Sequence, residues 1–492
     1  MLYEPTIGLE IHVELKTKTK MFCDSLNDPD EKHPNVNVCE VCLAHPGSLP
    51  VINQDAINKL LQVGLALNCQ VAEVSKFDRK NYFYPDLPKG YQISQYDMPL
   101  CKDGWLEIGE KKVNIERIHI EEDTGRLLHP VADPSAPVGA GYSLVDFNRA
   151  GVPLMELVTR PDFTNGREVE KFAKELQLIM RYLNASSADM EKGQLRIEVN
   201  ISVKRKTPSE KDNGKLGTKV EIKNINSINA AGRAVDYEIK RQTELLEKGE
   251  KIAQETRGWD EIKQKTISQR SKESAHDYRY FPEPDLPPMR FIKDQTEEIR
   301  LGLPELPAAR RARFAQEYAL NASQVEIFTI AKHLGDYYEK VASELGTADK
   351  KLYTLAANYI ITEFPPLLNM QGMEIDDLAG LQITPEAFAQ LINLLAERKL
   401  SSTAAKAVLK EMAAAGLHPE AIVKEKNLGQ VSDIGELQKV IDGVIANHPK
   451  AVADYRKGKI EVIKFLVGQV MAATHGQANP SVVSELLEKH LR

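Results

Sequence analysis

The sequence predicts an α+β protein in which a part rich in β-strands precedes a part made of helices. Four short segments in the first half alternate apolar and polar residues, as strands with one buried face do. From about residue 304 to residue 492, long stretches of Ala, Leu, Glu and Lys show helical spacing. Between these parts lies the proline-rich segment 281–288, which cannot continue a helix and indicates a rigid connection.

The four alternating segments place chemically active groups on their polar faces. Side chains that are two residues apart in a strand point to the same face of the sheet. In the first segment, Glu10 and His12 therefore share one face, and Leu9 and Ile11 share the other. Repeated Glu, His and Arg residues indicate a working surface rather than a generic wet face. The predicted strands are Ile7–Leu15, Ile115–Glu122, Leu195–Val203 and Lys219–Lys223.

Two helices interrupt the strand-rich half of the chain. Residues 162–183 place Val169, Phe172 and Leu176 at helical spacing, and residues 230–248 form a second helical segment. Within the helical half we expect a division between residues 405 and 425, because a further series of helix signals follows. The apolar stripes of these helices are predicted to be packing faces.

Composition narrows the functional classes. The 492 residues suggest about three domains, and no apolar run reaches the roughly 18 residues of a membrane span. The amino terminus lacks a secretory signal pattern, and the five mostly unclustered cysteines indicate a reducing compartment. We therefore expect a cytoplasmic protein without a membrane partner. The net charge of −7 argues against a general nucleic-acid coat but allows a local basic groove.

Acidic residues on the predicted strands indicate a site for a divalent cation. Mg²⁺ takes oxygen ligands, usually a few carboxylates together with water and substrate phosphates. If the strands are neighbours, their carboxylates meet on one surface and repel one another unless a cation lies among them. The alternative is a solvated sheet face with ion pairs. The candidates are Glu10, His12, Glu121, Glu122, Glu198 and Glu221.

Two similar segments combine basic and aromatic residues. In Lys76–Asp97, Arg79 and Lys80 lie among tyrosines and prolines, and Asp277–Leu286 repeats this composition around Arg279. Arg and Lys can neutralise phosphates, and Tyr or Phe can stack on a base. The alternative is a pair of proline-bent loops whose tyrosines pack on the sheet.

A third polar group lies in the segment Ser143–Glu156. Asp146 and Asn148 share one strand face, and Arg149 begins a turn. Together, these side chains suit a polar substrate. A structured turn explains them equally well.

Three cysteines form a partial zinc motif. Cys39 and Cys42 make a CxxC pair, and Cys23 lies nearby in the sequence. A closed zinc site needs four ligands, so either His33 or His45 would have to complete it.

Several long motifs resemble one protein family and extend over essentially the whole chain. They are similar to the B subunit of the aspartyl/glutamyl-tRNA(Asn/Gln) amidotransferase, which defines the GatB family. The motifs are Ile7–Leu15, Lys76–Asp97, Arg117–Gly125, Val145–Pro153, Glu221–Ser227, Gln254–Arg257 and Asp277–Asp285, followed by Tyr455–Lys459, Phe465–Met471 and Gly476–Pro480.

The resemblance implies three domains and a partnership. A cradle-like α+β domain built on antiparallel β-sheet would span 1–293, a helical domain 294–410, and a small helical tail domain 411–492. The last two would contact tRNA. In this family, the B subunit works in a heterotrimer with the A subunit, which is an amidase, and with the small C subunit.

The resemblance also implies a reaction. On the B subunit, the side-chain carboxylate of Glu-tRNA(Gln) or Asp-tRNA(Asn) is activated by phosphoryl transfer from ATP, with Mg²⁺ as cofactor. Ammonia, which the A subunit releases from glutamine, then forms the amide. The competing hypothesis is a tRNA-binding scaffold without its own chemistry.

Matching the family's motifs assigns roles to particular residues of this chain. The expected catalytic residues are Glu10, His12, Glu122 and Arg149. Metal ligands are expected among Glu10, His12, Glu121, Glu122, Glu198 and Glu221, and nucleotide or substrate contacts among Arg79, Lys80, Asp146, Asn148, Lys223 and Arg279.

Two positions depart from the family's pattern. The family often has Asp where this chain has Glu198, which changes the expected ligand geometry. Some members carry a CxC…CxxC zinc site, and here Ser25 stands at the second cysteine position. We therefore expect that site to be metal-free or to use a histidine.

Overall fold

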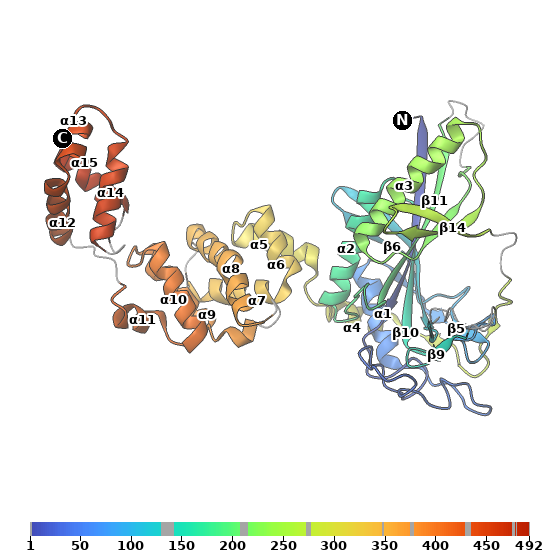
Figure 1. The fold of residues 1–492 in the computed structure, drawn as a ribbon. Helices are drawn as coiled ribbons and strands as arrows, with labels where there is room; N and C mark the ends of the chain where they lie inside the picture. Colours follow the sequence, from blue (N-terminus) through green and yellow to red (C-terminus); the bar gives the residue numbers. More distant parts are fainter. Residues whose placement is uncertain are drawn as a thin grey trace. The chain divides into compact units, whose positions relative to one another are not determined.

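The chain folds into two compact units, Met1–Pro307 and Ala308–Arg492 (Figure 1). The computed structural model describes residues 2–128, 142–206, 215–271, 277–346, 349–373, 378–428, 434–474, 478 and 480–491. The predicted α+β fold is confirmed, because a unit built on a mainly antiparallel sheet precedes a helical unit. Among the described residues, no helix combines the length and the apolar character that crossing a membrane requires.

A nine-stranded sheet forms the centre of the first unit in the part of the chain that is described. The strand order is β14-β13-β12-β11-β1-β10-β7-β6-β2, and neighbouring strands are antiparallel except β12 and β13. All four predicted strands are present as β1, β7, β11 and β12. The strands are β1 (Tyr3–Glu14), β2 (Gln70–Val71), β6 (Cys101–Ile108), β7 (Lys111–Glu122), β10 (Pro153–Thr159), β11 (Leu195–Arg205), β12 (Val220–Lys223), β13 (Glu255–Asp260) and β14 (Lys265–Ser271).

Helices cover the apolar face of this sheet. Ile11 of β1 and Ile197 of β11 are buried in one core with residues of α1 (Gln54–Ala66), α2 (Gly166–Tyr182) and α3 (Ile228–Glu247). Side-chain caps fix the first turns of these helices, since Asn53, Asn165 and Ser227 each accept backbone N–H hydrogen bonds. The opposite, polar face of the sheet is thereby left to form the candidate site.

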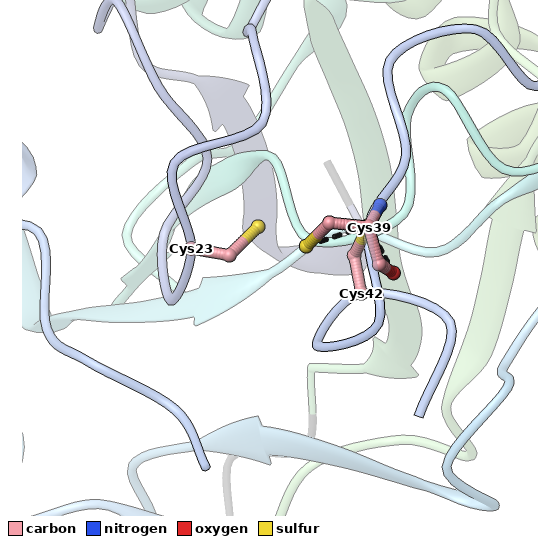
Figure 2. Close-up of side chains that lie close together, drawn as sticks. All are labelled: Cys23, Cys39 and Cys42. Carbon is pink, nitrogen blue, oxygen red and sulfur yellow. Dashed lines mark hydrogen bonds between the residues drawn. The ribbon is translucent and has the colours of Figure 1, made fainter. Parts of the chain in front are cut away.

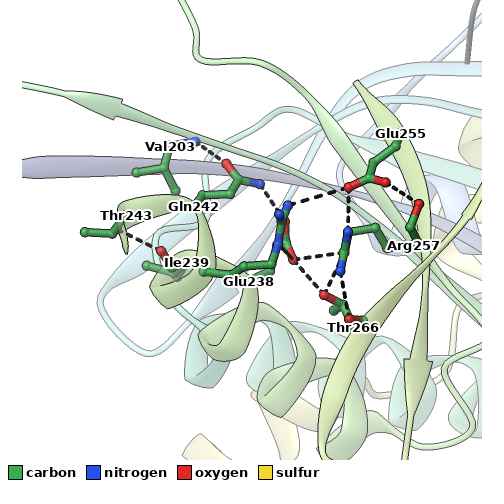
Figure 3. A network of polar contacts seen from close by, with 10 residues as sticks. Val203, Glu238, Ile239, Gln242, Thr243, Glu255, Arg257 and Thr266 are labelled. Carbon is green, nitrogen blue, oxygen red and sulfur yellow. Dashed lines mark hydrogen bonds and ion pairs between the residues drawn. The ribbon is translucent and has the colours of Figure 1, made fainter. Parts of the chain in front are cut away.

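A buried polar network fastens α3 to the β13–β14 hairpin (Figure 3). The Glu238 carboxylate is fully buried and accepts hydrogen bonds from Arg241 at 2.6 and 2.9 Å, from Gln242 at 2.9 Å and from Thr266 at 2.9 Å. The Arg257 guanidinium lies 3.7 Å from the same carboxylate. Because the buried charge is paired and hydrogen-bonded, it holds the helix and the hairpin in a defined relation.

Short strands bring the two basic and aromatic segments together. Strands β15 (Phe281–Pro282), β4 (Asp78–Asn81) and β5 (Tyr91–Ser94) form a sheet in that order, and β5 lies against β7. The sequence could not decide whether these two segments shared a site, and the β15–β4 pairing now places them side by side. The other short pairs are β16 (Met289–Arg290) with β3 (Val74–Ser75), and β8 (Arg126–Leu128) with β9 (Leu144–Asp146).

The second unit contains two separate hydrophobic cores among its described residues. The first core extends from Phe314 to Ile422, and the second from Leu437 to Leu491. Helix α4 (Lys293–Leu301) belongs to the first unit, where it packs on α1. The three-domain division at 293/294 and 410/411 stays a prediction. The helices of the second unit are α5 (Pro307–Glu317), α6 (Ala322–Ile330), α7 (Lys332–Glu344), α8 (Lys350–Met370), η2 (Leu378–Leu381), α9 (Pro385–Ala396), α10 (Ser402–Ala415), α11 (Pro419–Glu425), α12 (Ile434–Asn447), α13 (Pro449–Arg456), α14 (Val462–Ala473) and α15 (Pro480–Leu491).

Candidate functional site

A cavity of about 1300 Å³ opens on the polar face of the central sheet. Its floor consists of side chains from β7, β10, β1, β11 and β12, and its wall includes residues of β4, β5 and the segment 278–280. We call this cavity the cleft. The charged floor residues are Glu10, His12, Glu116, Arg117, His119, Glu121, Glu156, Arg196, Glu198, Glu221 and Lys223.

The pairing register of the strands explains why these side chains meet. Glu10 lies opposite Glu198 across the β1–β11 pair, and His12 lies opposite Glu156 across the β1–β10 pair. Glu156 in turn lies opposite His119 on β7. Because directly opposed residues project to the same face, one row of acidic and histidine side chains crosses the floor of the cleft.

The acidic-histidine cluster, formed by Glu10, His12, His119, Glu121 and Glu156, is centred on Glu156. The Glu156 Oε2 atom lies 3.5 Å from His12 Nε2 and 3.4 Å from His119 Nε2. The His12 Nε2 atom is also 3.9 Å from Glu10 Oε1 and 4.0 Å from Glu121 Oε1. Three carboxylates therefore converge on two imidazoles.

The electrostatics of the cluster favour a positive charge at its centre. Burial, and then the charge of Glu156, raise the pKa of Glu10 above its ordinary value. Burial alone would lower the pKa of His12, but the hydrogen bond to Glu156 and the charges of Glu156 and Glu121 raise that pKa to about 9. The carboxylates thus hold a proton on His12 when no other cation is present.

The donor set of the cluster fits a divalent cation. The ligand atoms of Glu10, His12 and Glu156 lie within 4.8 Å of one another, and so do those of His119, Glu121 and Glu156. His119 Nδ1 is buried without a hydrogen-bond partner among the described residues. Carboxylate oxygens suit Mg²⁺, and imidazole nitrogens suit transition metals, so both kinds of donor are available.

Cations flank the cluster on both sides. The Lys223 Nζ atom lies 2.8 Å from Glu198 Oε2 and 3.7 Å from Glu221 Oε1, so these two predicted metal ligands are paired with a lysine. On the other side, burial opposes the charge of Lys80, but Glu121 and other nearby groups raise the pKa of its ammonium above the ordinary value. The cleft therefore combines a cluster whose donors suit a divalent cation with fixed positive charges that can meet phosphate or carboxylate oxygens.

Glu122 and Arg79, which the sequence placed in the site, lie outside the cleft. Glu122 follows Glu121 directly in β7 and therefore points to the other face. Its carboxylate accepts hydrogen bonds from Lys89 Nζ at 2.7 Å and from the Ile93 N–H at 2.9 Å. Arg79 donates to Glu283 at 2.7 and 2.9 Å and to Asp285 at 3.4 Å, which fixes the β15–β4 pair.

Asp146, Asn148 and Arg149 hold loops rather than line the cleft. Asp146 Oδ1 accepts the Asn35 N–H at 3.0 Å, and Asn148 Oδ1 accepts the Asn37 N–H at 2.9 Å. Both bonds therefore fasten the loop that precedes the CxxC pair.

Arg149 reaches the cleft only indirectly. Its guanidinium donates to the carbonyl oxygens of Thr124 and Gly125 at 3.0 and 2.9 Å. It also lies 3.6 Å from Asp123, which does line the cleft. The expected substrate contacts of these three residues stay predictions.

Arg279 adopts a left-handed backbone with φ of 44°. Its carbonyl oxygen accepts a hydrogen bond from Asn81 Nδ2 at 2.8 Å, which ties the segment to β4. Its neighbours Tyr278 and Tyr280 line the cleft, although Arg279 itself does not. An unusual backbone of this kind is retained where the surrounding structure enforces it, here beside the candidate site.

Sequence reasoning missed Glu156, and it placed His119 and Arg196 on the polar faces of predicted strands without assigning them a role in the site. Glu156 is the single charged residue in the otherwise apolar or neutral segment Pro153–Thr159, and it is 5% exposed. A lone carboxylate in such a strand is a usable signal, because buried charges require partners. Arg196 donates to Asp123 at 2.6 Å and shares the cleft floor.

Aromatic side chains form the mouth of the cleft. The rings of Tyr96 and Tyr280 stack with centroids 4.2 Å apart and an interplanar angle of 11°. Phe83, which also lines the cleft, is 83% exposed. The Lys80 Nζ atom lies 5.3 Å from the centroid of the Tyr278 ring. This rim is suited to stacking on a planar ring that enters from solvent.

Cys23, Cys39 and Cys42 lie close together and form the cysteine cluster (Figure 2). None of the three lines the cleft. The three sulfur atoms of the cluster lie within 4.8 Å of one another. The Lys20 Nζ atom is 3.7 Å from Cys42 Sγ, and Ser25 Oγ is 3.8 Å away. An ammonium has no lone pair to offer, so the described residues of this group lack the fourth ligand of a closed zinc site.

The histidines that the sequence offered as a fourth ligand do not join this group. The exposed His33 pairs instead with Glu31 at 3.0 Å, and His45 is not among the donors within 4.8 Å. Zinc binding stays a prediction that would need a ligand from outside the described group.

The fold and the cleft define a class of protein with a charged cleft on a mainly antiparallel sheet, followed by a helical unit. Residues 5–297 match the GatB/GatE catalytic domain, and residues 336–491 match the GatB domain. This chain belongs to the GatB family.

Relatives are similar over their whole length. The B subunit of the aspartyl/glutamyl-tRNA(Asn/Gln) amidotransferase from Carboxydothermus hydrogenoformans is 49% identical over 493 residues, covering 99% of each chain. The proteins of the same name from Caldanaerobacter subterraneus subsp. tengcongensis and Thermoanaerobacter pseudethanolicus are each 46% identical over 495 residues, covering 100% of each chain. The predicted family is confirmed.

Proposed function

We propose that this chain is the B subunit of a tRNA-dependent amidotransferase and that its cleft activates a side-chain carboxylate with ATP. The substrates would be Glu-tRNA(Gln), Asp-tRNA(Asn) or both. The observation that carries the proposal is the acidic-histidine cluster, flanked by Lys80 and Lys223, within the unit that matches a catalytic domain. The names of the relatives describe the same reaction class.

The chemistry of the cleft suits phosphoryl transfer. This reaction needs positioning, a divalent cation and positive charge near the phosphates more than a protein nucleophile. Mg²⁺ would be held by Glu10, Glu121 and Glu156, with His12 and His119 beside them, and would neutralise phosphate charge. Lys80 and Lys223 provide fixed positive charge for phosphate or carboxylate oxygens. The substrate's own carboxylate is the nucleophile.

The aromatic rim supplies a place for a base. We assign Tyr96 and Tyr280 to stacking on an adenine ring, either of ATP or of the 3′ end of the tRNA. A cavity of about 1300 Å³ has room for a nucleotide beside an aminoacyl group. The helical unit and two further chains, the amidase (A subunit) and the small C subunit, would complete the enzyme, which acts in the cytoplasm where tRNA is aminoacylated.

The test is amide formation by the heterotrimer made with candidate A and C subunits. We expect Gln-tRNA(Gln) or Asn-tRNA(Asn) to form only when misacylated tRNA, ATP and Mg²⁺ are all present. Glu10→Ala should abolish the product while leaving tRNA binding largely intact. Tight tRNA binding without ATP-dependent product, with active partner subunits, would instead identify a tRNA-binding scaffold.

A further inference from the structure

We propose that Cys39 and Cys42 are a thiol pair that hydrogen peroxide oxidises to a disulfide, with the Cys42 thiolate as the attacking group. The two residues lie outside the cleft, and the proposed carboxylate activation uses neither of them. The inference concerns a modification site on the chain and does not depend on the proposed function.

The surroundings of Cys42 stabilise a thiolate. The Cys39 N–H donates to Cys42 Sγ at 3.1 Å, and the Lys20 Nζ atom lies 3.7 Å from the same sulfur. Lys20 is fully buried, and its ammonium also donates to the carbonyl oxygen of Phe147 at 3.1 Å. A buried ammonium is costly without a nearby negative charge, and Cys42 is the ionisable group that it contacts. Thiolates beside lysine are the reactive form of cysteine.

The geometry favours Cys39 as the second thiol. Its Sγ atom lies 3.9 Å from Cys42 Sγ, and Figure 2 shows the two side chains converging from one turn. A disulfide has a sulfur separation of about 2.05 Å, and Cys-x-x-Cys is a spacing that disulfide oxidoreductases bridge.

A small cavity gives an oxidant access to the thiolate. Its volume is about 220 Å³, and both Cys42 and Cys23 line it. Cys69 and Cys101 are buried in the apolar core and do not line this cavity, so they serve as internal controls.

The reaction proceeds in two balanced steps. The Cys42 thiolate attacks one oxygen of hydrogen peroxide, so that an S–O bond forms, the O–O bond breaks and hydroxide leaves. The Cys39 thiol then attacks the sulfenic sulfur of Cys42. The S–S bond forms, the S–O bond breaks, and the hydroxyl leaves as water with the thiol proton. The two sulfurs lose two electrons, which reduce the peroxide.

The experiment treats the full chain with hydrogen peroxide, blocks free thiols and maps disulfides by mass spectrometry. We expect a Cys39–Cys42 bridge that dithiothreitol reverses, while Cys69 and Cys101 stay reduced. Lys20→Met removes the ammonium that lies 3.7 Å from Cys42 Sγ and should therefore slow bridge formation, whereas Lys20→Arg should retain most of the rate. Thermal unfolding confirms that each variant is folded.

A second variant keeps the test decisive if Lys20→Met does not fold. In Cys39→Ser, the sulfenic acid of Cys42 should persist and react with dimedone. A Cys23–Cys42 bridge, equal oxidation of all five cysteines, or a Lys20→Met rate equal to that of the unaltered chain would overturn the proposal. Stoichiometric zinc that protects all three thiols would also overturn it.

Discussion

Replacing Glu156 by Gln tests the central claim about the cleft. The substitution preserves size and removes the charge that lies 3.5 Å from His12 and 3.4 Å from His119. Two unit charges 3.5 Å apart interact by about 5 kcal/mol at an effective dielectric constant of about 20. Glu156 is only 5% exposed, so solvent screens this interaction weakly.

A divalent cation bound in the cluster would lose its attraction to the same carboxylate charge. Water and the remaining carboxylates of Glu10 and Glu121 recover part of the interaction. We therefore expect a net loss of about 3 kcal/mol, or about 150-fold in cation affinity. Titration with Mn²⁺, followed by electron paramagnetic resonance, measures this affinity directly, and amide formation by the heterotrimer should fall by about the same factor at limiting Mg²⁺.

The matched control is Glu116→Gln on the same strand, β7. Glu116 also lines the cleft, but its side chain is 52% exposed and pairs with its neighbour Arg117. We expect this variant to bind Mn²⁺ within about twofold of the unaltered chain. If Glu156→Gln binds Mn²⁺ as tightly as the control, the cluster is not the cation site and the reasoning is refuted.

Three further predictions concern stability, base stacking and pH. Glu238→Ala, which leaves Arg241 without its bidentate partner, should lower the free energy of unfolding by about 3 kcal/mol. Urea unfolding followed by tryptophan fluorescence measures this free energy, since Trp105 and Trp259 both lie in the first unit. Glu244→Ala, at an exposed position, is the control, and a loss of unfolding free energy in Glu238→Ala no larger than in this control would contradict the prediction. Tyr96→Leu should raise the KM for ATP or for tRNA about tenfold, because it removes the aromatic ring. Tyr96→Phe keeps the ring and should leave the KM unchanged. Equal KM values in the two variants would exclude stacking. In metal-free protein, protonated His12 contributes its full stabilisation below pH 6.5 and loses it as the pH rises through its raised pKa of about 9. The free energy of unfolding of the unaltered chain should therefore exceed that of His12→Gln by less and less over this pH interval. A difference that grows with pH would refute the predicted direction.

Much of the fold followed from local patterns. The alternation in Ile7–Leu15 identified β1 and both of its faces, and the spacing in 162–183 identified α2. These predictions succeed because each depends on the period of a single element. Strand β10 was missed as a strand, because Glu156 is the single charged residue of Pro153–Thr159 and has apolar residues on both sides, so the segment lacks clear alternation.

The site was harder to predict than the fold. Glu10, His12 and Glu121 meet in the cleft as the sequence indicated, whereas Glu122 points to the opposite face. Alternation already separates Glu121 from Glu122, so that distinction was available from the sequence. Arg79 pairs with Glu283 and Asp285, which lie about two hundred residues away along the chain. The sequence around Arg79 therefore could not predict these ion pairs.

By itself, the sequence determined the class of the protein, the polar face of each strand and the chemistry available on it. It could not determine which strands are neighbours, because alternation fixes the face of a side chain and not its partner across the sheet. The tertiary structure placed β10 between β1 and β7 and set the register that brings Glu156 between His12 and His119. A cation site requires donors within a few ångströms of one another, and only the pairing of distant segments creates that proximity.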